Sequence, residues 1–325
     1  CLLGHRLGDE DRVGIAGGAE RKVPAMFRVP VEDGVPEGGR ERSRSRHPPT
    51  IWDEGDPDDP KFEGWSTLAA LAVLTERPRL GLLVGANTFR NPGLTAKLAT
   101  TLDHLSNGRA VLGLGGGWFE REHDAFGIEF GSGFGERLDR LDESVGLLRR
   151  LLDGERVTHE GRFYTMDDAL CSPLPVQSRL PILIGGSGPT KTLRTTARYA
   201  DLWNGYGPPE RIAATSEILR QRCAEVGRPF DQIERTVTID AVVRDTPGAA
   251  ETAWAETARI HGIGDRIDDN GSERGLTIGG SPRDLAGYAA RLEALGIGEV
   301  IFTFRAPFDL ETIERIGEVR AALRS

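Results

Sequence analysis

Two glycine-rich segments lie where the chain could bind a flat or charged ligand. The first is the apolar run 110–114 followed by Gly115-Gly116-Gly117 and Trp118, and the second is 181–184 followed by Gly185-Gly186-Ser187-Gly188. Glycine has no Cβ, so a flat ligand can approach the backbone closely there, and a tryptophan can stack on it or form a pocket wall. The alternative is that the glycines make a tight turn and Trp118 plugs one end of the fold.

The second glycine segment has the features of a phosphate site. The helix predicted from Pro189 to about Tyr199 has no acidic residue in its first turns, and Lys191 and Arg194 are nearby. Free N–H groups at a helix N-terminus attract anions, and cations add to that attraction. The segment also resembles a G-x-S-x-G hydrolase elbow, but residue 189 is proline and no partner His or Asp is evident. We therefore interpret Ser187 as a phosphate ligand.

A strand followed by glycines is also typical of dinucleotide-binding folds. The pattern G-x-G-x-x-G requires glycine at position 118, where this chain has tryptophan. No acidic residue ends a following strand at the required distance. The first glycine segment is therefore not a dinucleotide fingerprint.

Polar side chains follow these strands at the same end of the predicted sheet. His123 titrates near neutral pH, and burial of Glu120 would raise its pKa, so both are candidates for acid–base chemistry. The alternative is a solvated surface helix, EREHDAFG. Asn87 and Thr88 follow the apolar run 79–84, and Asn204 follows another short strand. Each asparagine could cap a helix, but several such groups at one rim are typical of a ligand site.

Short apolar strands alternate with amphipathic helices from residue 79 onward. Continuous apolar strands, each followed by a helix, indicate a parallel sheet covered by helices. Six strands are predicted, near residues 80, 110, 182, 203, 239 and 301. Because a closed (β/α)8 barrel needs eight, and a helix is predicted at 65–76, the missing pair is expected before residue 60. Residues 50–325 are thus predicted to form one TIM-barrel domain of the α/β class.

Residues 1–49 form an atypical segment rich in Gly, Pro and Arg. Residues 1–60 hold nine glycines and seven prolines, and Val35 is the only aliphatic residue in 32–50. One interpretation is a disordered basic arm; the other, which we favour, is a stretch whose sequence was replaced by a shifted reading frame. Residues 13–16 and 26–31 are the only candidate strands there.

The composition excludes several functional classes. No apolar run approaches the roughly 20 residues that cross a bilayer. The formal net charge of −9 argues against a nucleic-acid partner and favours a small-molecule substrate. Cys1, Cys171 and Cys223 are far apart, and the six histidines do not approach them at ligand spacing. We expect reduced thiols, no metal and a cytoplasmic location.

Segments 62–127 and 181–207, which include GLGGGWFEREHDAFG and PILIGGSGPTKTLR, resemble the bacterial luciferase-like monooxygenase family. The resemblance is strongest to the branch of oxidoreductases that depend on the deazaflavin coenzyme F420. It implies a (β/α)8 barrel that binds F420, or FMN as the alternative, at the carboxyl ends of the strands, without a metal. It also implies a homodimer.

The resemblance, together with the patterns above, selects the candidate site residues. In the segment that corresponds to residues 84–87, relatives often have a non-proline cis peptide. The candidates for cofactor binding are Val84, Gly85, Ala86, Asn87, Gly117, Trp118, Gly185, Gly186, Ser187, Gly188 and Lys191. The candidates for catalysis are His123 and Glu120, and those for substrate binding are Glu63, Trp65, Trp203 and Asn204.

One departure from the family pattern affects catalysis. Relatives carry an Asp-His or similar pair after the second strand, near the reactive ring carbon, whereas this chain has SRSRHPPTIWDE, with no acid before His47.

Three functions follow as hypotheses. The first is an F420-dependent oxidoreductase that moves hydride to or from a small organic substrate; the second is an FMN-dependent monooxygenase; the third is a non-catalytic cofactor-binding protein.

Overall fold

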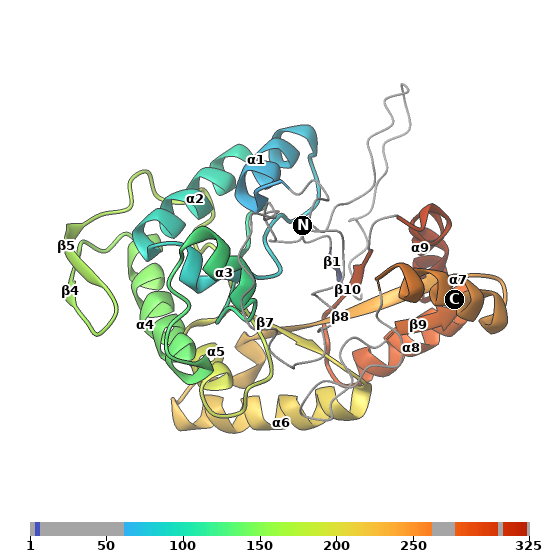
Figure 1. Ribbon diagram of the computed structural model, residues 1–325. Helices are drawn as coiled ribbons and strands as arrows, with labels where there is room; N and C mark the ends of the chain where they lie inside the picture. The colour runs from blue at the N-terminus through green and yellow to red at the C-terminus, as the bar shows by residue number, and fades with distance from the viewer. Residues whose placement is uncertain (1–3, 7–61, 262–276, 305–307, 324–325) are drawn as a thin grey trace, which may run out of the picture.

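The structure, a computed structural model, describes residues 4–6, 62–261, 277–304 and 308–323. Helices surround a mainly parallel central sheet (Figure 1). Neighbouring strands follow the order β1-β10-β8-β7-β6-β3-β2, and β9 also pairs with β8. The strands of this sheet are β1 (Gly4–Arg6), β2 (Gly85–Ala86), β3 (Leu112–Gly115), β6 (Ile182–Gly185), β7 (Leu202–Tyr206), β8 (Glu234–Val243), β9 (Thr277–Gly280) and β10 (Glu299–Thr303).

Five of the predicted strands are confirmed as β3, β6, β7, β8 and β10. The strand predicted at 79–84 differs, because only Leu80 bridges to Ala110 before β2 begins at Gly85. Between them the Leu83–Val84 peptide bond is cis. The Val84 side chain lies against the glycines of β3 and β6.

The sheet edge formed by β2 is not paired with β1 within the described residues. β1 is antiparallel to β10, unlike the other strand pairs described in this sheet. The candidate strands at 13–16 and 26–31 lie outside the described residues, as does the predicted atypical segment apart from residues 4–6.

Eight longer helices and one short helix cover the described strands. Their starts follow local sequence signals. Asn91 caps α2, with Pro92 at its first position, and Ser281 with Asp284 forms a capping box on α8. Within the described residues, no helix is both long and apolar enough to cross a membrane. The helices are α1 (Gly64–Leu74), α2 (Pro92–Leu105), α3 (Glu120–Phe126), α4 (Phe134–Leu152), α5 (Thr192–Tyr199), α6 (Pro209–Glu225), α7 (Pro247–His261), α8 (Pro282–Ala294) and α9 (Leu310–Leu323).

The core has an inner and an outer layer. Val111, Leu183, Leu202 and Ile301 pack together inside the curve of the sheet, with Val84 against them. Larger clusters fill the space between the sheet and the helices. Alternate residues of each strand therefore face the inner and the outer layer. The segments that follow the carboxyl ends of the strands form the rim of the barrel.

A hairpin lies outside the barrel against α4. It consists of β4 (Val157–Glu160) and β5 (Thr165–Ala169), which pair in antiparallel. The Glu143 carboxylate on α4 accepts hydrogen bonds from the backbone N–H groups of Phe163, at 3.2 Å, and Tyr164, at 2.9 Å, and lies 3.2 Å from Nε2 of His159. This carboxylate therefore helps to hold the hairpin on the helix, together with the buried Val157 and Met166.

Candidate active site at the strand ends

The two glycine segments lie side by side at the carboxyl ends of neighbouring strands. β3 pairs in parallel with β6, with Leu114 opposite Ile184, so the segments that follow them leave the sheet at the same edge. β6 in turn pairs with β7, with Gly185 opposite Asn204. The glycine segments thus share one rim, where TIM-barrel enzymes place their sites.

The strand glycines provide room for Val84. A Cβ on Gly115 would lie 2.7 Å from one methyl group of Val84, and a Cβ on Gly185 would lie 2.9 Å from the other. A Cβ on Gly113 would collide with the Leu82 carbonyl oxygen. The glycines accommodate the irregular segment 82–86, and Val84 then forms an apolar surface next to the rim.

The Gly185–Gly188 loop is held by bonds from both sides. Gly186 has φ +125°, which favours glycine, and its N–H donates to the Asn204 carbonyl at 3.1 Å. The buried Trp203 indole donates to the Gly186 carbonyl at 2.8 Å. The Leu193 N–H donates to the Gly188 carbonyl at 3.0 Å. The loop is therefore fixed before any ligand arrives.

The Ser187 hydroxyl is the clearest sign of a ligand at this loop. Its oxygen is buried and has no hydrogen-bond partner within the described part of the chain. Native structures rarely leave a buried hydroxyl unsatisfied. α5 begins three residues later than predicted, at Thr192, after a turn at 189–191, and no acidic residue lies in its first turn. The hydroxyl and the positive end of α5 together suit a phosphate.

Lys191 lies at the same helix start but its ammonium group contacts α4. Nζ lies 2.7 Å from a carboxylate oxygen of Asp139 and donates to the Gly135 carbonyl at 2.9 Å. The lysine therefore ties α5 to α4 in this structure and does not converge with Ser187.

His123 is buried behind the rim and makes two hydrogen bonds. It is 1% exposed, and its Nδ1 lies 2.7 Å from the Phe119 carbonyl, which can only accept. Nδ1 therefore carries the proton of the neutral ring, and Nε2 accepts from the Thr88 hydroxyl at 2.6 Å. Burial lowers the pKa of the His123 imidazole, and the charge of Arg137 lowers it further, against the opposing effect of the Phe119 bond. The ring is thus a neutral base near pH 7.

The surroundings of His123 fix its position. The rings of Phe89 and Phe130 lie with their centroids 4.6 Å from the imidazole. The Arg137 guanidinium stacks 3.6 Å over the Phe130 ring and donates to the Gly117 carbonyl at 3.1 Å. The half-buried Thr88 is therefore the residue through which His123 reaches the rim.

Trp118 and Glu120 are exposed at the start of α3. Trp118 is 48% exposed and lies beside the Phe119 ring, so it can form a wall of the rim. Glu120 is exposed as well, which removes the burial on which its predicted acid role depended. Of the two predicted acid–base residues, only His123 is buried.

The chain matches a known family across most of its length. Residues 47–296 match the model of the luciferase-like monooxygenases. The chain belongs to the luciferase-like monooxygenase family. An uncharacterized protein of Mycobacterium tuberculosis (strain ATCC 25618 / H37Rv) is 31% identical over 278 residues, which cover 84% of this chain and 86% of that protein. Membership makes the chain an oxidoreductase.

Two further matches describe related proteins. A phthiodiolone/phenolphthiodiolone dimycocerosates ketoreductase of the same Mycobacterium tuberculosis strain is 29% identical over 286 residues, which cover 81% of this chain and 72% of that protein. The structure of an F420-dependent secondary alcohol dehydrogenase in complex with an F420-acetone adduct aligns with a TM-score of 0.69 and 19% identity, covering 82% of this chain and 86% of that one. The structural likeness assigns the TIM-barrel fold of the family to this chain.

All four predicted substrate residues of this luciferase-like protein lie in the described part of the chain. Glu63 caps α1 by accepting from the N–H groups of Trp65 and Ser66, at 3.0 and 2.7 Å. Although burial opposes the shift, these bonds and the charge of Arg90 lower the pKa of Glu63. Trp65 and Trp203 are buried in the outer core rather than at the rim. Both indole rings fill the core between strands and helices. The sequence pattern does not distinguish a tryptophan in that core from one at the rim.

The side chains of Asn87 and Asn204 point in different directions. Asn87 is buried and donates to the Tyr164 hydroxyl at 3.1 Å, so it faces the hairpin outside the barrel. Asn204 donates to the Thr236 hydroxyl at 2.9 Å and accepts from Thr238 at 3.2 Å, inside the strand ends. Asn204 is thus held near the rim, whereas Asn87 supports the fold behind it.

Proposed function

We propose that this luciferase-like protein is an F420-dependent oxidoreductase that transfers hydride between the deazaflavin and a small organic substrate. The observation that carries the proposal is the buried Ser187 hydroxyl, which lies in the loop before α5 and has no hydrogen-bond partner among the described residues. Support also comes from the similarity to a ketoreductase in sequence and to an F420-dependent secondary alcohol dehydrogenase in structure. Both chemistries add or remove hydride at a carbon bearing oxygen.

The residues present fit such a cofactor. Ser187 and the N-terminus of α5 would hold its phosphate, and Val84 with Gly117 would border its ring. When bound, a deazaflavin supplies or accepts the hydride. Trp118, exposed at the rim, would exclude water from one side of the reacting carbon.

Thr88 and His123 would handle the proton that accompanies the hydride. During oxidation of an alcohol, the Thr88 oxygen accepts the alcohol proton while the Thr88 proton moves to Nε2 of His123. During reduction of a carbonyl, a protonated His123 returns the proton by the reverse path. The neutral ring fixed by Phe119 is in the form that accepts a proton. Glu120, exposed to water, takes no part in this proposal.

Binding of F420 and of FMN to the purified protein, each by fluorescence titration, tests the function. We expect clear preference for F420, followed by its reduction or oxidation with small alcohols or ketones. Preference for reduced FMN with oxygen consumption would instead indicate a monooxygenase. Binding of F420 without turnover of any alcohol or ketone would contradict the enzyme proposal and indicate a cofactor-binding protein.

We also propose a cytoplasmic location. Cys171 and Cys223 are buried and free in the structure, and buried free thiols are typical of a reducing compartment. Fractionation of the native host, followed by detection of the protein in each fraction, tests this location. Detection in the periplasmic or secreted fraction would contradict it.

A further inference from the structure

The inner face of β8 carries polar side chains where the strand approaches the rim. Val237 and Ile239 pack in the outer core, against the helices. Because side chains alternate along a strand, Thr236, Thr238 and Asp240 face the inside of the barrel. The strand therefore turns three polar side chains inward, and Asp240 is the one nearest the carboxyl end.

The two neighbouring strands extend this polar surface. Leu202 on β7 and Ile301 on β10 belong to the inner apolar cluster. Asn204 and Thr303, each two residues further along its strand, therefore face inward as well. Thr303 lies opposite Asp240 in the strand register. A polar strip thus crosses three strands above the apolar inner core, and it consists of Asn204, Thr236, Thr238, Asp240 and Thr303.

The hydrogen bonds within the polar strip run in one direction. The Thr236 hydroxyl donates its only proton to the Trp203 carbonyl at 3.1 Å, so it must accept from the Asn204 amide, at 2.9 Å. The Asn204 oxygen then accepts the Thr238 proton, at 3.2 Å. Because Thr238 has used its proton, its oxygen can only accept a further bond. A carboxylate such as that of Asp240 also only accepts, and it accepts several bonds at once.

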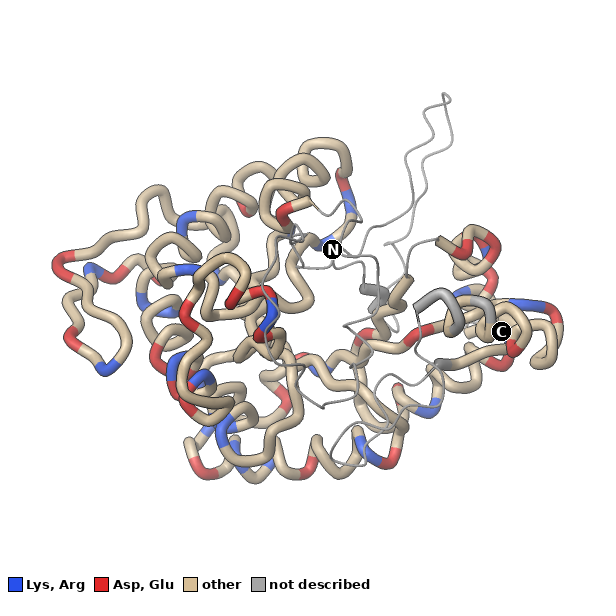
Figure 2. Tube along the Cα trace, in the orientation of Figure 1, with Lys and Arg blue, Asp and Glu red and all other residues tan. Residues whose placement is uncertain are grey.

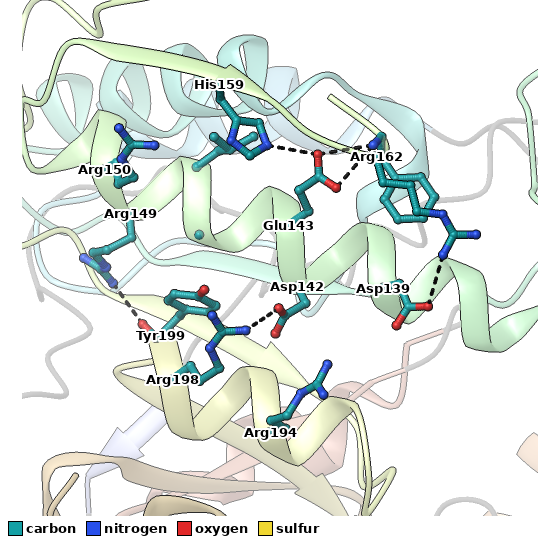
Figure 3. A pocket seen from close by; sticks show the side chains of 13 residues that line it. Asp139, Asp142, Glu143, Arg149, Arg150, His159, Arg162, Arg194, Arg198 and Tyr199 are labelled. Carbon is teal, nitrogen blue, oxygen red and sulfur yellow. Dashed lines mark hydrogen bonds and ion pairs between the residues drawn. The ribbon is translucent and has the colours of Figure 1, made fainter. Parts of the chain in front are cut away.

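Asp240 differs in place from the other charged residues of the sheet. Among the described parallel strands, it is the one Asp, Glu, Lys or Arg in a carboxyl-terminal half, and it is buried. Glu234 and Glu299 lie at the amino ends, where both pair with Arg79. Figure 2 shows most charged positions on the helices and loops around the sheet. Glu143, outside the barrel, bonds the hairpin (Figure 3). Asp240 is thus the acidic group that these strands place at the rim.

We propose that the polar strip binds a hydroxyl group of the substrate and that Asp240 selects hydroxylated ketones and polyols over hydrocarbon ketones and alcohols. Thr88 takes the oxygen at the reacting carbon, and the strip takes a second oxygen. Acceptors such as Thr238 and Asp240 match the proton of a hydroxyl, and a bond to a carboxylate is the stronger kind. A hydrocarbon group would displace water from these acceptors and return no hydrogen bond. The inference rests on the proposed function, because it names the substrate class of the same site.

Reduction of matched ketones by the protein with reduced F420 tests the substrate class. The pairs are acetone with dihydroxyacetone, and methyl propyl ketone with the ketose xylulose. We expect the hydroxylated member of at least one pair to have a kcat/KM higher by about tenfold, as expected for one hydrogen bond to a charged group. Binding of the same ketones to the protein with oxidised F420, followed by cofactor fluorescence, should rank them in the same order without turnover.

Variants of the polar strip make the test specific. Asp240→Asn keeps the size of the side chain and removes its charge, so the preference for the hydroxylated ketone should fall by about tenfold. Thr238→Val should lower the preference by about threefold, because a neutral hydrogen bond contributes less, and Thr238→Ser should retain most of it. Asp231→Asn makes the same change at an exposed aspartate before the amino end of β8 and is the matched control. Thermal melting of each variant checks that the fold is retained.

The outcomes separate this inference from the proposed function. Turnover of the ketones with equal or lower kcat/KM for the hydroxylated member of both pairs would overturn the polar strip and leave the proposed function intact. A preference that Asp240→Asn does not change, or an equal loss for both members of a pair, would also overturn it. A higher kcat/KM for aminoacetone than for dihydroxyacetone would overturn the assignment to hydroxyl groups. Absence of turnover of every ketone and alcohol would overturn the proposed function itself.

Discussion

At the scale of single residues, Ser187 is where a ligand is most directly indicated. A hydrogen bond to a charged group contributes about 1.5–3 kcal/mol. Ser187→Ala should therefore weaken F420 binding by at least about tenfold. The melting temperature should stay unchanged or rise slightly, since the buried hydroxyl has no partner among the described residues. Ser178→Ala, which changes an exposed serine outside the loop, is the control for the same titration. Unchanged affinity in Ser187→Ala would place the phosphate elsewhere.

Thr88 is the residue through which His123 can act. Thr88→Val keeps the shape but removes the hydroxyl, and should lower turnover about a hundredfold with cofactor affinity little changed. Thr88→Ser should retain most of the rate. His123→Ala should lower turnover at least about tenfold, and the double variant should be little worse than Thr88→Val, because the two act as one path. Additive losses in steady-state kinetics would argue against a shared proton path.

The titration of His123 also links pH to stability. Burial lowers the pKa of His123 below its unfolded value of about 6.5, so the unfolded chain binds this proton more readily. Its contribution to stability is therefore fully present above pH 6.5 and is lost as the pH falls towards the pKa of the folded state. Urea unfolding between pH 7.5 and 5 should show a shallower decline in His123→Gln than in the parent protein.

Residue types alone located the rim but not the direction of each side chain. The glycines, Ser187 and His123 could be selected because each type has a known use after a strand. Trp203 could not be assigned to the core, because its direction depends on which face of β7 meets α5 and α6. Arg137, which joins Gly117 to Phe130, was missed because nothing in the local sequence links positions 20 residues apart.

At the scale of elements, Glu143 holds the β4–β5 hairpin on α4. Glu143→Ala would leave the N–H groups of Phe163 and Tyr164 without their acceptor. The free energy of unfolding should fall by about 1–3 kcal/mol, and limited proteolysis should cut the hairpin first. Glu160→Ala, at an exposed position of the same hairpin, should change neither measurement. Hairpin cleavage at the parent rate in Glu143→Ala would show that other contacts hold it.

The helices were more predictable from the sequence than the strand expected at 79–84. Caps such as Asn91 and Ser281 act within four residues, so their sequence is sufficient to place α2 and α8. The segment 79–84 has the composition of a strand, yet its pairing depends on glycines in β3 and β6 that give Val84 its place. Such an interruption is a property of three segments together and is not visible in any one of them.

At the scale of the whole molecule, α1 and α2 carry large apolar side chains that are exposed. Val73 and Leu74 on α1 are 64% and 69% exposed, and Leu94 on α2 is 54% exposed. The two helices pack side by side on one side of the barrel (Figure 1). Exposed large apolar side chains on neighbouring helices are candidates for burial against a partner. We propose that a second copy of this chain covers these side chains, as expected from the family.

Light scattering after size-exclusion chromatography tests this assembly. The parent protein should have twice the chain mass of 35.3 kDa. Leu94→Glu combined with Val73→Glu should give the monomer, because two charges would be buried without partners at each side of a symmetric interface. Leu310→Glu, which adds the same charge at an exposed leucine of α9 on another side of the molecule, should leave the dimer intact. A parent protein of single-chain mass at micromolar concentration would refute the dimer, and a dimer that survives both substitutions would place the interface on a different face.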